Sequence, residues 1–116
     1  METITKVLTT KAIRISLMQE LEEVAHGYLF LITNDKHQEP YGLLEDLFVS
    51  PTQRLKGYAR ELINKIITRA KEEKCYKLIA TSRHSKPEVH EVYKKLGFND
   101  HGLEFRMDLM KTESKY

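Results

Sequence analysis

Two cations, a glycine and the start of a long helical pattern meet between residues 49 and 59. The segment reads Val49-Ser50-Pro51-Thr52-Gln53-Arg54-Leu55-Lys56-Gly57-Tyr58-Ala59. A helix N-terminus presents unpaired N–H groups and a positive dipole end, both of which favour a phosphate. Gly57 lets a ligand approach the backbone, and Arg54 and Lys56 add positive charge. The segment predicts a diphosphate site, although glycine near a helix start is also common turn chemistry.

Several side chains are candidates for proton transfer. Glu45 and Asp46 are neighbours in an apolar segment, so on a strand they face opposite sides and at most one enters a site. Glu45 is our candidate base, with an ordered water as the alternative. His84 and His90 have the side chain that titrates nearest neutral pH, although a surface histidine is the commoner outcome. The five histidines show no ligand spacing, so we predict no metal site.

The elements that must position these residues follow from hydrophobic periodicity. Apolar side chains at 59, 62, 63, 66, 67 and 70 form one stripe of a helix. A second helix is predicted from Pro87, with its stripe at 89, 92, 93 and 96 and Gly97 as its C-cap. Residues 34–40 read as a loop. The predicted strands are 12–19, 27–33, 43–49, 77–81 and 103–109, with a weaker edge strand over 2–10.

The order of strands and helices predicts an α/β (α+β) fold with an antiparallel first half. A helical crossover between residues 49 and 77 makes its two flanking strands parallel. The 116 residues, of which 41% are hydrophobic and 31% charged, fit a single domain over 1–116. The net charge of +2 argues against a dedicated nucleic-acid-coating protein.

Composition also indicates the cellular compartment of the protein. Cys75 is the only cysteine, which excludes an intramolecular disulfide and fits a reducing compartment; we expect it to be buried beside a strand. The N-terminus lacks an apolar signal core, and no apolar run approaches the roughly 18 residues that span a bilayer. We therefore expect a cytoplasmic protein without membrane contact.

Two motifs together resemble the GNAT superfamily of acetyl-CoA-dependent N-acetyltransferases. Arg54-x-x-Gly57-x-Ala59 after a strand is similar to that family's pyrophosphate loop, (Arg/Gln)-x-x-Gly-x-(Gly/Ala). Tyr93-Lys94-Lys95-Leu96-Gly97-Phe98 is similar to its Tyr-x-x-x-Gly-Phe helix ending. The resemblance covers residues 42–109. Leu44-Glu45-Asp46 and Cys75-Tyr76-Lys77 resemble, more thinly, the glucosamine-phosphate N-acetyltransferases.

The resemblance implies a GNAT-like, mostly antiparallel mixed sheet flanked by two helices, with acetyl-CoA in the splay between two central parallel strands. Backbone groups of Leu47, Phe48 and Val49 would bind the pantetheine arm. The diphosphate would lie on the amides of residues 54–59, that is Arg54, Leu55, Lys56, Gly57, Tyr58 and Ala59. Tyr93 would protonate the leaving thiolate: a phenol of pKa about 10 can protonate a thiolate whose thiol has a pKa of about 8.5 once it is close by. On its residues alone, Tyr93 is more simply a core aromatic on the apolar stripe of a helix, and only together with Arg54 and Gly57 does it indicate a functional role.

The chain departs from the family pattern in three places. Leu55 stands where the family commonly has glycine, and Lys86 stands where many members have an asparagine that binds the cofactor arm. Strands begin almost at once, so the N-terminal helices that help to form the acceptor pocket are reduced or absent. The acceptor site is then either open, admitting a peptide amine, or completed by a second subunit in a homodimer.

The function that the resemblance implies is direct transfer of acetyl from acetyl-CoA to a primary amine, on a small molecule or a peptide. One alternative is a non-catalytic CoA-binding regulatory domain. Another is a nucleic-acid module that uses the cations of the first helix; these are more simply a solvated helix face, and we expect no nucleic-acid partner. They are Lys56, Arg60, Lys65, Arg69 and Lys71.

Overall fold

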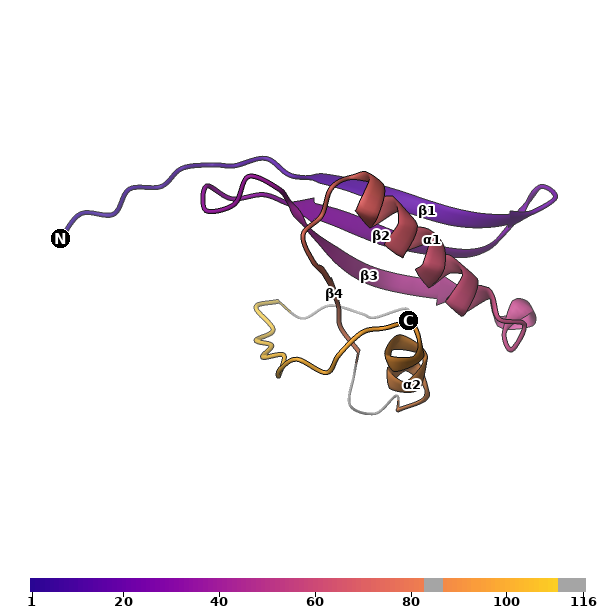
Figure 1. Ribbon diagram of the computed structural model, residues 1–116. Helices are drawn as coiled ribbons and strands as arrows, with labels where there is room; N and C mark the ends of the chain where they lie inside the picture. The colour runs from indigo at the N-terminus through magenta and orange to yellow at the C-terminus, as the bar shows by residue number, and fades with distance from the viewer. Residues whose placement is uncertain (83–86, 111–116) are drawn as a thin grey trace. The chain divides into compact units, whose positions relative to one another are not determined.

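The structure is a computed structural model that describes residues 1–82 and 87–110. The chain forms two compact units that divide between Ala80 and Thr81. The first unit contains a sheet and a helix (Figure 1). Its elements are β1 (Lys11–Gln19), β2 (Glu22–Ile32), β3 (Tyr41–Val49), a short 3-10 turn (Pro51–Gln53), α1 (Tyr58–Glu72) and β4 (Leu78–Ala80).

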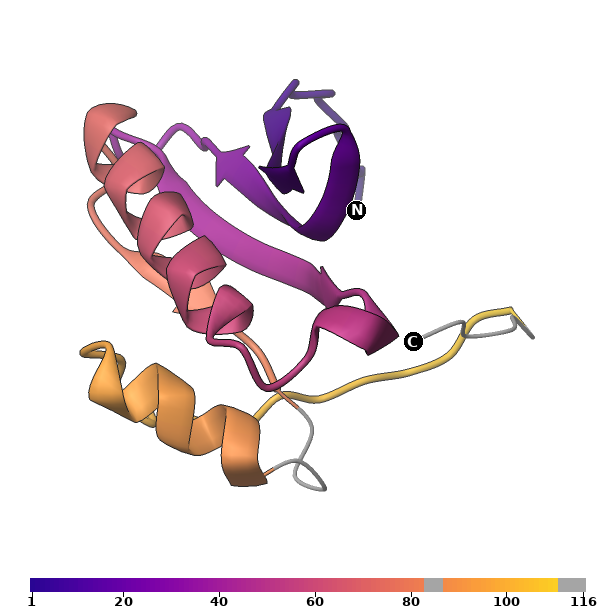
Figure 2. The same cartoon turned by 90° about the vertical axis from the view of Figure 1, so that its right-hand side faces the viewer.

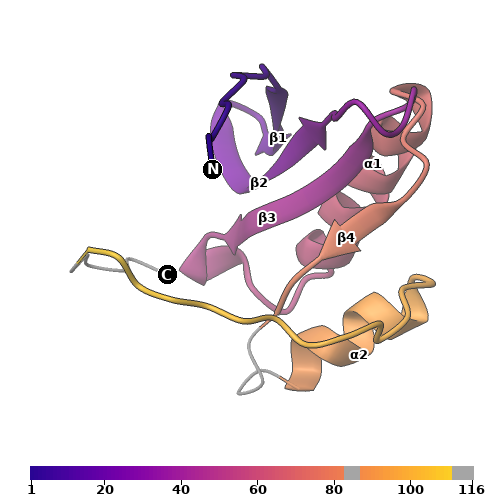
Figure 3. The same ribbon diagram turned by 90° about the vertical axis from the view of Figure 1, so that its left-hand side faces the viewer.

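The four strands form one mixed sheet in the order β1-β2-β3-β4 (Figure 3). β1 pairs with β2, and β2 with β3, in antiparallel fashion; β3 and β4 are parallel. This confirms the predicted antiparallel first half and the parallel pair on either side of the crossover helix. β3 is central as expected, whereas β4 is the edge strand of the described sheet.

α1 covers one face of the sheet (Figure 2). Its predicted stripe is buried at Leu62, Ile63, Ile66 and Ala70, and the facing strands contribute Leu29 and Leu44 to the same core. The helix ends where Lys74 takes a left-handed conformation (φ 65°) and the Cys75 N–H donates to the Ala70 carbonyl at 3.0 Å. This closure satisfies carbonyls that the last turn leaves open. Cys75 itself is only half-buried, less than we predicted.

The second unit contains α2 (Pro87–Lys95). Gly97 follows the helix in a left-handed conformation (φ 100°), and the Phe98 N–H donates to the Tyr93 carbonyl at 3.0 Å. The predicted glycine C-cap is therefore confirmed.

Two predicted strands are wrong. Residues 2–10 and 103–109 have no regular secondary structure, and all of them are exposed. The second segment alternates apolar and polar residues as predicted, yet Leu103, Phe105 and Met107 stay 72–89% exposed. Alternation becomes a strand only where a neighbouring strand completes its hydrogen bonds and a core covers its apolar face, and the described residues supply neither.

Candidate active site

The loop between β3 and α1 contains two left-handed residues close together. Leu55 has φ 64° and Gly57, the N-cap of α1, has φ 81°. Leucine pays a steric cost for this conformation whereas glycine does not. The position where the family commonly has glycine is thus one that requires positive φ. The Leu55 side chain is fully exposed to solvent.

The N-terminus of α1 is open to a ligand. No side chain caps it, and the Glu61 N–H, which donates to the Gly57 carbonyl at 3.1 Å, begins the helical ladder. The N–H groups of Tyr58, Ala59 and Arg60 precede that first bond and have no intrahelical acceptor. A Cβ placed on Gly57 would find no atom within 4 Å, so the space beside the backbone is empty. A free dipole end beside empty space fits a diphosphate.

The two cations predicted for this loop both lie in it. Arg54 Nε donates to the Val49 carbonyl at 3.2 Å, which ties the loop to the end of β3. Lys56 Nζ lies 3.0 Å from Gln53 Oε1. Each contact uses only one donor of a side chain that carries several, so both cations retain N–H groups for an anion.

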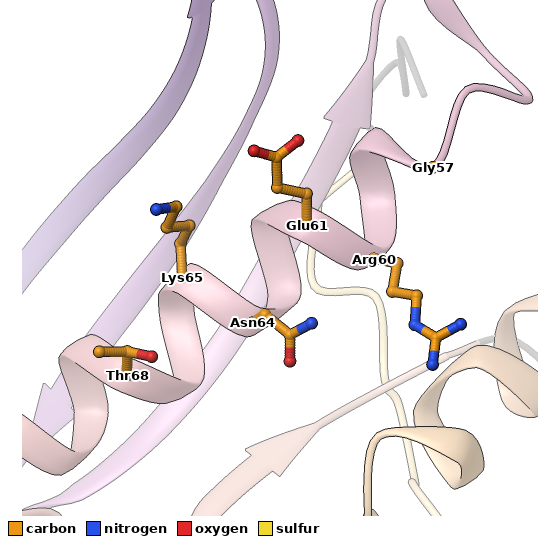
Figure 4. A pocket seen from close by; sticks show the side chains of 6 residues that line it. All are labelled: Gly57, Arg60, Glu61, Asn64, Lys65 and Thr68. Atoms are coloured by element: carbon orange, nitrogen blue, oxygen red, sulfur yellow. The ribbon is translucent and has the colours of Figure 1, made fainter.

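A shallow groove extends from this N-terminus along the outer surface of α1 (Figure 4). Its side chains project away from the helix axis, with the guanidinium of Arg60 and the ammonium of Lys65 on different sides. The groove therefore offers further positive charge to an anionic ligand longer than a diphosphate. It is lined by Gly57, Arg60, Glu61, Asn64, Lys65 and Thr68.

β3 separates from β4 at the middle of its length. The ladder between them joins only residues 42–44 to residues 78–80. The backbone of β3 from Glu45 to Val49 is consequently not paired with β4. This part of β3 contains Leu47, Phe48 and Val49, the three residues predicted to bind a pantetheine arm, and an extended ligand can bind along a strand edge as a further strand would.

A bulge interrupts the other side of the same stretch. His26 pairs with Phe48 and Tyr28 pairs with Glu45, so Asp46 and Leu47 both lie opposite Gly27. Asp46 takes φ 54° at this point. A bulge leaves a residue out of the ladder, and such features are frequent beside active sites. The bulge thus places Asp46 and Leu47 at an interruption of the regular ladder between β2 and β3.

Glu45 and Asp46 occupy different environments, as predicted. A Cβ on Gly27 would contact Ile66 of α1, so Tyr28, the next residue, faces away from α1. Glu45 is the cross-strand partner of Tyr28 and shares that face, where it is half-buried. Asp46 is exposed. Glu45 is thus the carboxylate that belongs to a defined face of the sheet.

Tyr93 lies in the second unit, on α2. Its side chain is 9% exposed, and its ring centroid lies 5.2 Å from that of Phe98. Burial raises the pKa of the Tyr93 hydroxyl above its usual value of 10.0, so the group is a phenol throughout the neutral range. His90 lies one turn earlier on the same helix. His84 and Lys86 lie outside the described residues.

One polar network was not predicted from the sequence. Arg14 on β1 forms an ion pair with Glu23 on β2, with NH2 to Oε2 at 3.0 Å, and Ser16 Oγ donates to Glu23 at 2.6 Å. Glu23 Oε2 also lies 3.2 Å from Nδ1 of His26, a ring that is buried. These contacts lower the pKa of Glu23 to about 2, mainly through the hydrogen bond from Arg14. Only the strand register reveals this cluster.

Within the described residues there is no group of three or more His, Cys, Asp or Glu side chains arranged to hold a metal ion. Neither described helix has the length and apolar composition needed to cross a bilayer.

Comparison with known proteins gives one family match and many structural neighbours. Residues 13–98 match the model of the acetyltransferase (GNAT) family. A search of curated protein sequences finds no match. An acetyltransferase of Trypanosoma brucei superposes with a TM-score of 0.75 at 25% identity, covering 84% of this chain and 69% of that one.

Two other neighbours show the fold alone. A glucosamine-6-phosphate N-acetyltransferase of Arabidopsis thaliana has a TM-score of 0.74 at 17% identity, over 85% of this chain and 67% of its own. A transcriptional regulator of Bacillus halodurans has a TM-score of 0.79 at 21% identity, over 84% of this chain and 66% of its own. The chain thus spans about two thirds of the length of these proteins.

Proposed function

Because the chain belongs to the GNAT family of acetyltransferases, we propose that it transfers an acetyl group from acetyl-CoA directly to a primary amine. The amine is carried by a small molecule or by a peptide. The observation that supports this most is the uncapped N-terminus of α1, where Gly57 leaves empty space beside backbone N–H groups. That arrangement suits the diphosphate of the donor.

The donor is proposed to bind through the first unit. Its diphosphate lies on the amides of residues 54–59, with the Arg54 guanidinium beside it, and its pantetheine arm runs along β3 at Leu47–Val49, beyond the short ladder with β4. Negative charge develops on the acetyl oxygen during attack, and a released backbone N–H stabilises such charge. Leu47, in the bulge, is the proposed donor of that N–H.

Two side chains are proposed to handle protons. Alkylamines are mostly protonated near neutral pH, with pKa values of about 10. Glu45 is proposed to receive the ammonium group and draw off its proton, directly or through an ordered water. Tyr93 is proposed to give a proton to the leaving thiolate, and its raised pKa keeps it protonated for that step.

Donor binding is tested by thermal-shift titration of the whole chain with acetyl-CoA and CoA. A ligand that binds the native state raises its stability by mass action. Arg54→Ala should weaken the binding of both ligands by about tenfold, since it removes a charge-assisted contact. Arg106→Ala is the matched control, because Arg106 contacts Asp108 within its own segment. Equal affinity in the wild type and Arg54→Ala would contradict the proposed diphosphate site.

Transfer is tested with acetyl-CoA and a panel of amines, read as release of free thiol. The panel contains glucosamine 6-phosphate, a polyamine, an aminoglycoside and a lysine peptide. The proposal expects turnover with at least one amine and a product acetylated on nitrogen. Binding of acetyl-CoA without turnover of any amine would instead favour the non-catalytic CoA-binding domain.

A further inference from the structure

His26 is a buried side chain that the proposed reaction does not yet use. It lies on β2 with 8% of its surface exposed, and it is the only buried polar or charged residue among those that the structure describes. Its ring lies 5.5 Å from the ring of Phe48 and 5.9 Å from that of Tyr28, measured between centroids. A polar ring held between two aromatic rings has a fixed orientation.

Glu23 determines which nitrogen of His26 carries the proton. Its Oε2 lies 3.2 Å from Nδ1, and a carboxylate can only accept a hydrogen bond. Arg14 and Ser16 keep Glu23 ionised, with a pKa of about 2. Nδ1 therefore carries the hydrogen, and neutral His26 has its lone pair on Nε2.

The other ring nitrogen, Nε2, keeps some contact with solvent. Among the described groups, none forms a hydrogen bond with it, and no buried side-chain nitrogen or oxygen lacks a partner. Both findings hold only if Nε2 is in contact with solvent. A neutral imidazole with a carboxylate on Nδ1 and an accessible Nε2 is a general base.

The position of His26 links this base to the proposed reaction. His26 and Tyr28 flank Gly27, opposite the bulge that holds Leu47, and both face away from α1. Glu45, the partner of Tyr28, is a diagonal neighbour of His26 on the same face. Diagonal neighbours on one face have backbones about 7–8 Å apart, within reach of long side chains.

We propose that His26, held by Glu23, is the group that takes up the proton of the amine substrate. This inference rests on the proposed function. The ammonium gives one proton, through Glu45 or water, to Nε2. The free amine then attacks the thioester carbon, a C–N bond forms and the C–S bond breaks. The thiolate takes a proton from Tyr93, which regains one from the reacting nitrogen, and the imidazolium releases its own to water.

Glu23 is a positioning residue in this scheme, and the charged or titratable groups around His26 define the expected pH profile. On this face they are Arg14 from β1, Glu23 and Tyr28 from β2, and Glu45 from β3. Arg14 stays a cation and Glu23 an anion over the neutral range. An ionisation that disappears from the kcat/KM profile when His26 is replaced would therefore be assigned to His26.

The kinetic test uses the panel amine with the highest turnover in the wild type. His26→Gln should lower kcat at least tenfold and remove the acid limb of the kcat/KM profile, with an unchanged KM for acetyl-CoA. Added imidazole should restore turnover to His26→Ala, which a purely structural role would not allow. His37→Gln is the matched control. His37 lies in the loop before β3 and packs on the ring of Tyr76, so this variant should behave as the wild type.

A second readout needs no turnover. The nitrogen chemical shifts of neutral His26 should show the hydrogen on Nδ1, and Glu23→Gln should mix the two tautomers. A hydrogen on Nε2 overturns the inference, as does a His26→Gln variant with normal kcat and pH profile; the proposed function survives both results. A wild-type chain that acetylates no amine defeats the proposed function and this inference together.

Discussion

Leu47 on β3 packs directly against the bare Cα of Gly27 on β2. A Cβ built on Gly27 would lie 2.8 Å from Cδ2 of Leu47 and 3.1 Å from Cδ1 of Ile66. This close approach lies at the bulge of β3, so side chains of β3 and α1 meet there over Gly27 of β2. The absence of a side chain at Gly27 is what gives Leu47 room to pack there beside Ile66.

Gly27→Ala should therefore destabilise the first unit. The added methyl must displace Leu47 and Ile66, and overpacking costs about 1–3 kcal/mol, partly offset by about 0.5 kcal/mol from reduced freedom of the unfolded chain. We expect a net loss of about 1 kcal/mol in urea unfolding, together with weaker acetyl-CoA binding because the bulge shifts. Gly102→Ala is the control, since a Cβ there meets no atom within 4 Å. An unchanged unfolding midpoint in Gly27→Ala would contradict this account of the bulge.

Most of the first unit could be predicted from hydrophobic periodicity. The stripe of α1 and the apolar runs of β1, β3 and β4 set the elements to within a few residues. β2 was predicted from Gly27 but begins at Glu22, because Glu22 and Glu23 look like loop residues until a partner strand neutralises one of them. In the structure Glu23 pairs with Met18 of β1, and its carboxylate forms an ion pair with the Arg14 side chain of the same strand.

The candidate site likewise contains one part that could be predicted from the sequence and one that could not. Its loop could be predicted because Arg54, Gly57 and Ala59 are adjacent in sequence and their role is carried mainly by the backbone. The environment of His26 could not, because it depends on a register shift at Leu17/Met18 and another at His26/Tyr28. A bulge changes which side chains share a face, and no periodicity in one strand records it.

Leu55→Gly should preserve ligand binding and should not lower stability. Glycine relieves the left-handed strain of Leu55, a gain of about 1–2 kcal/mol, and loses about 0.5–1 kcal/mol to its freer unfolded state. The net change is an increase of up to about 1.5 kcal/mol in the free energy of unfolding, measured by urea titration. Acetyl-CoA affinity should stay within about twofold, because only the peptide of residue 55 is proposed to bind. A large loss of affinity would show that the leucine side chain itself contacts the donor.

Glu23 should make the fold sensitive to acid. Its pKa is lowered from the usual 4.5 to about 2 in the folded chain. A depressed carboxyl pKa contributes stability that is fully present above pH 4.5 and is lost as the pH falls through 2. Glu23→Gln should be less stable than the wild type at pH 7, and the difference should shrink between pH 4.5 and 2 in thermal melts. Glu22→Gln, the neighbouring exposed carboxyl, is the control; a constant gap between Glu23→Gln and wild type across this window would refute the linkage.

Tyr93→Phe should slow turnover without weakening donor binding. General-acid catalysis contributes about 10²–10⁴-fold, so kcat should fall by at least about a hundredfold while the CoA thermal shift stays the same. Burial raises the pKa of the Tyr93 hydroxyl above 10.0, so the wild type should keep its kcat to pH 9 and lose it only at higher pH, as the phenol ionises. Tyr76→Phe, which alters a partly exposed ring of the first unit, should leave kcat unchanged. Normal turnover in Tyr93→Phe would show that Tyr93 only packs on the apolar side of α2. Water would then have to protonate the thiolate.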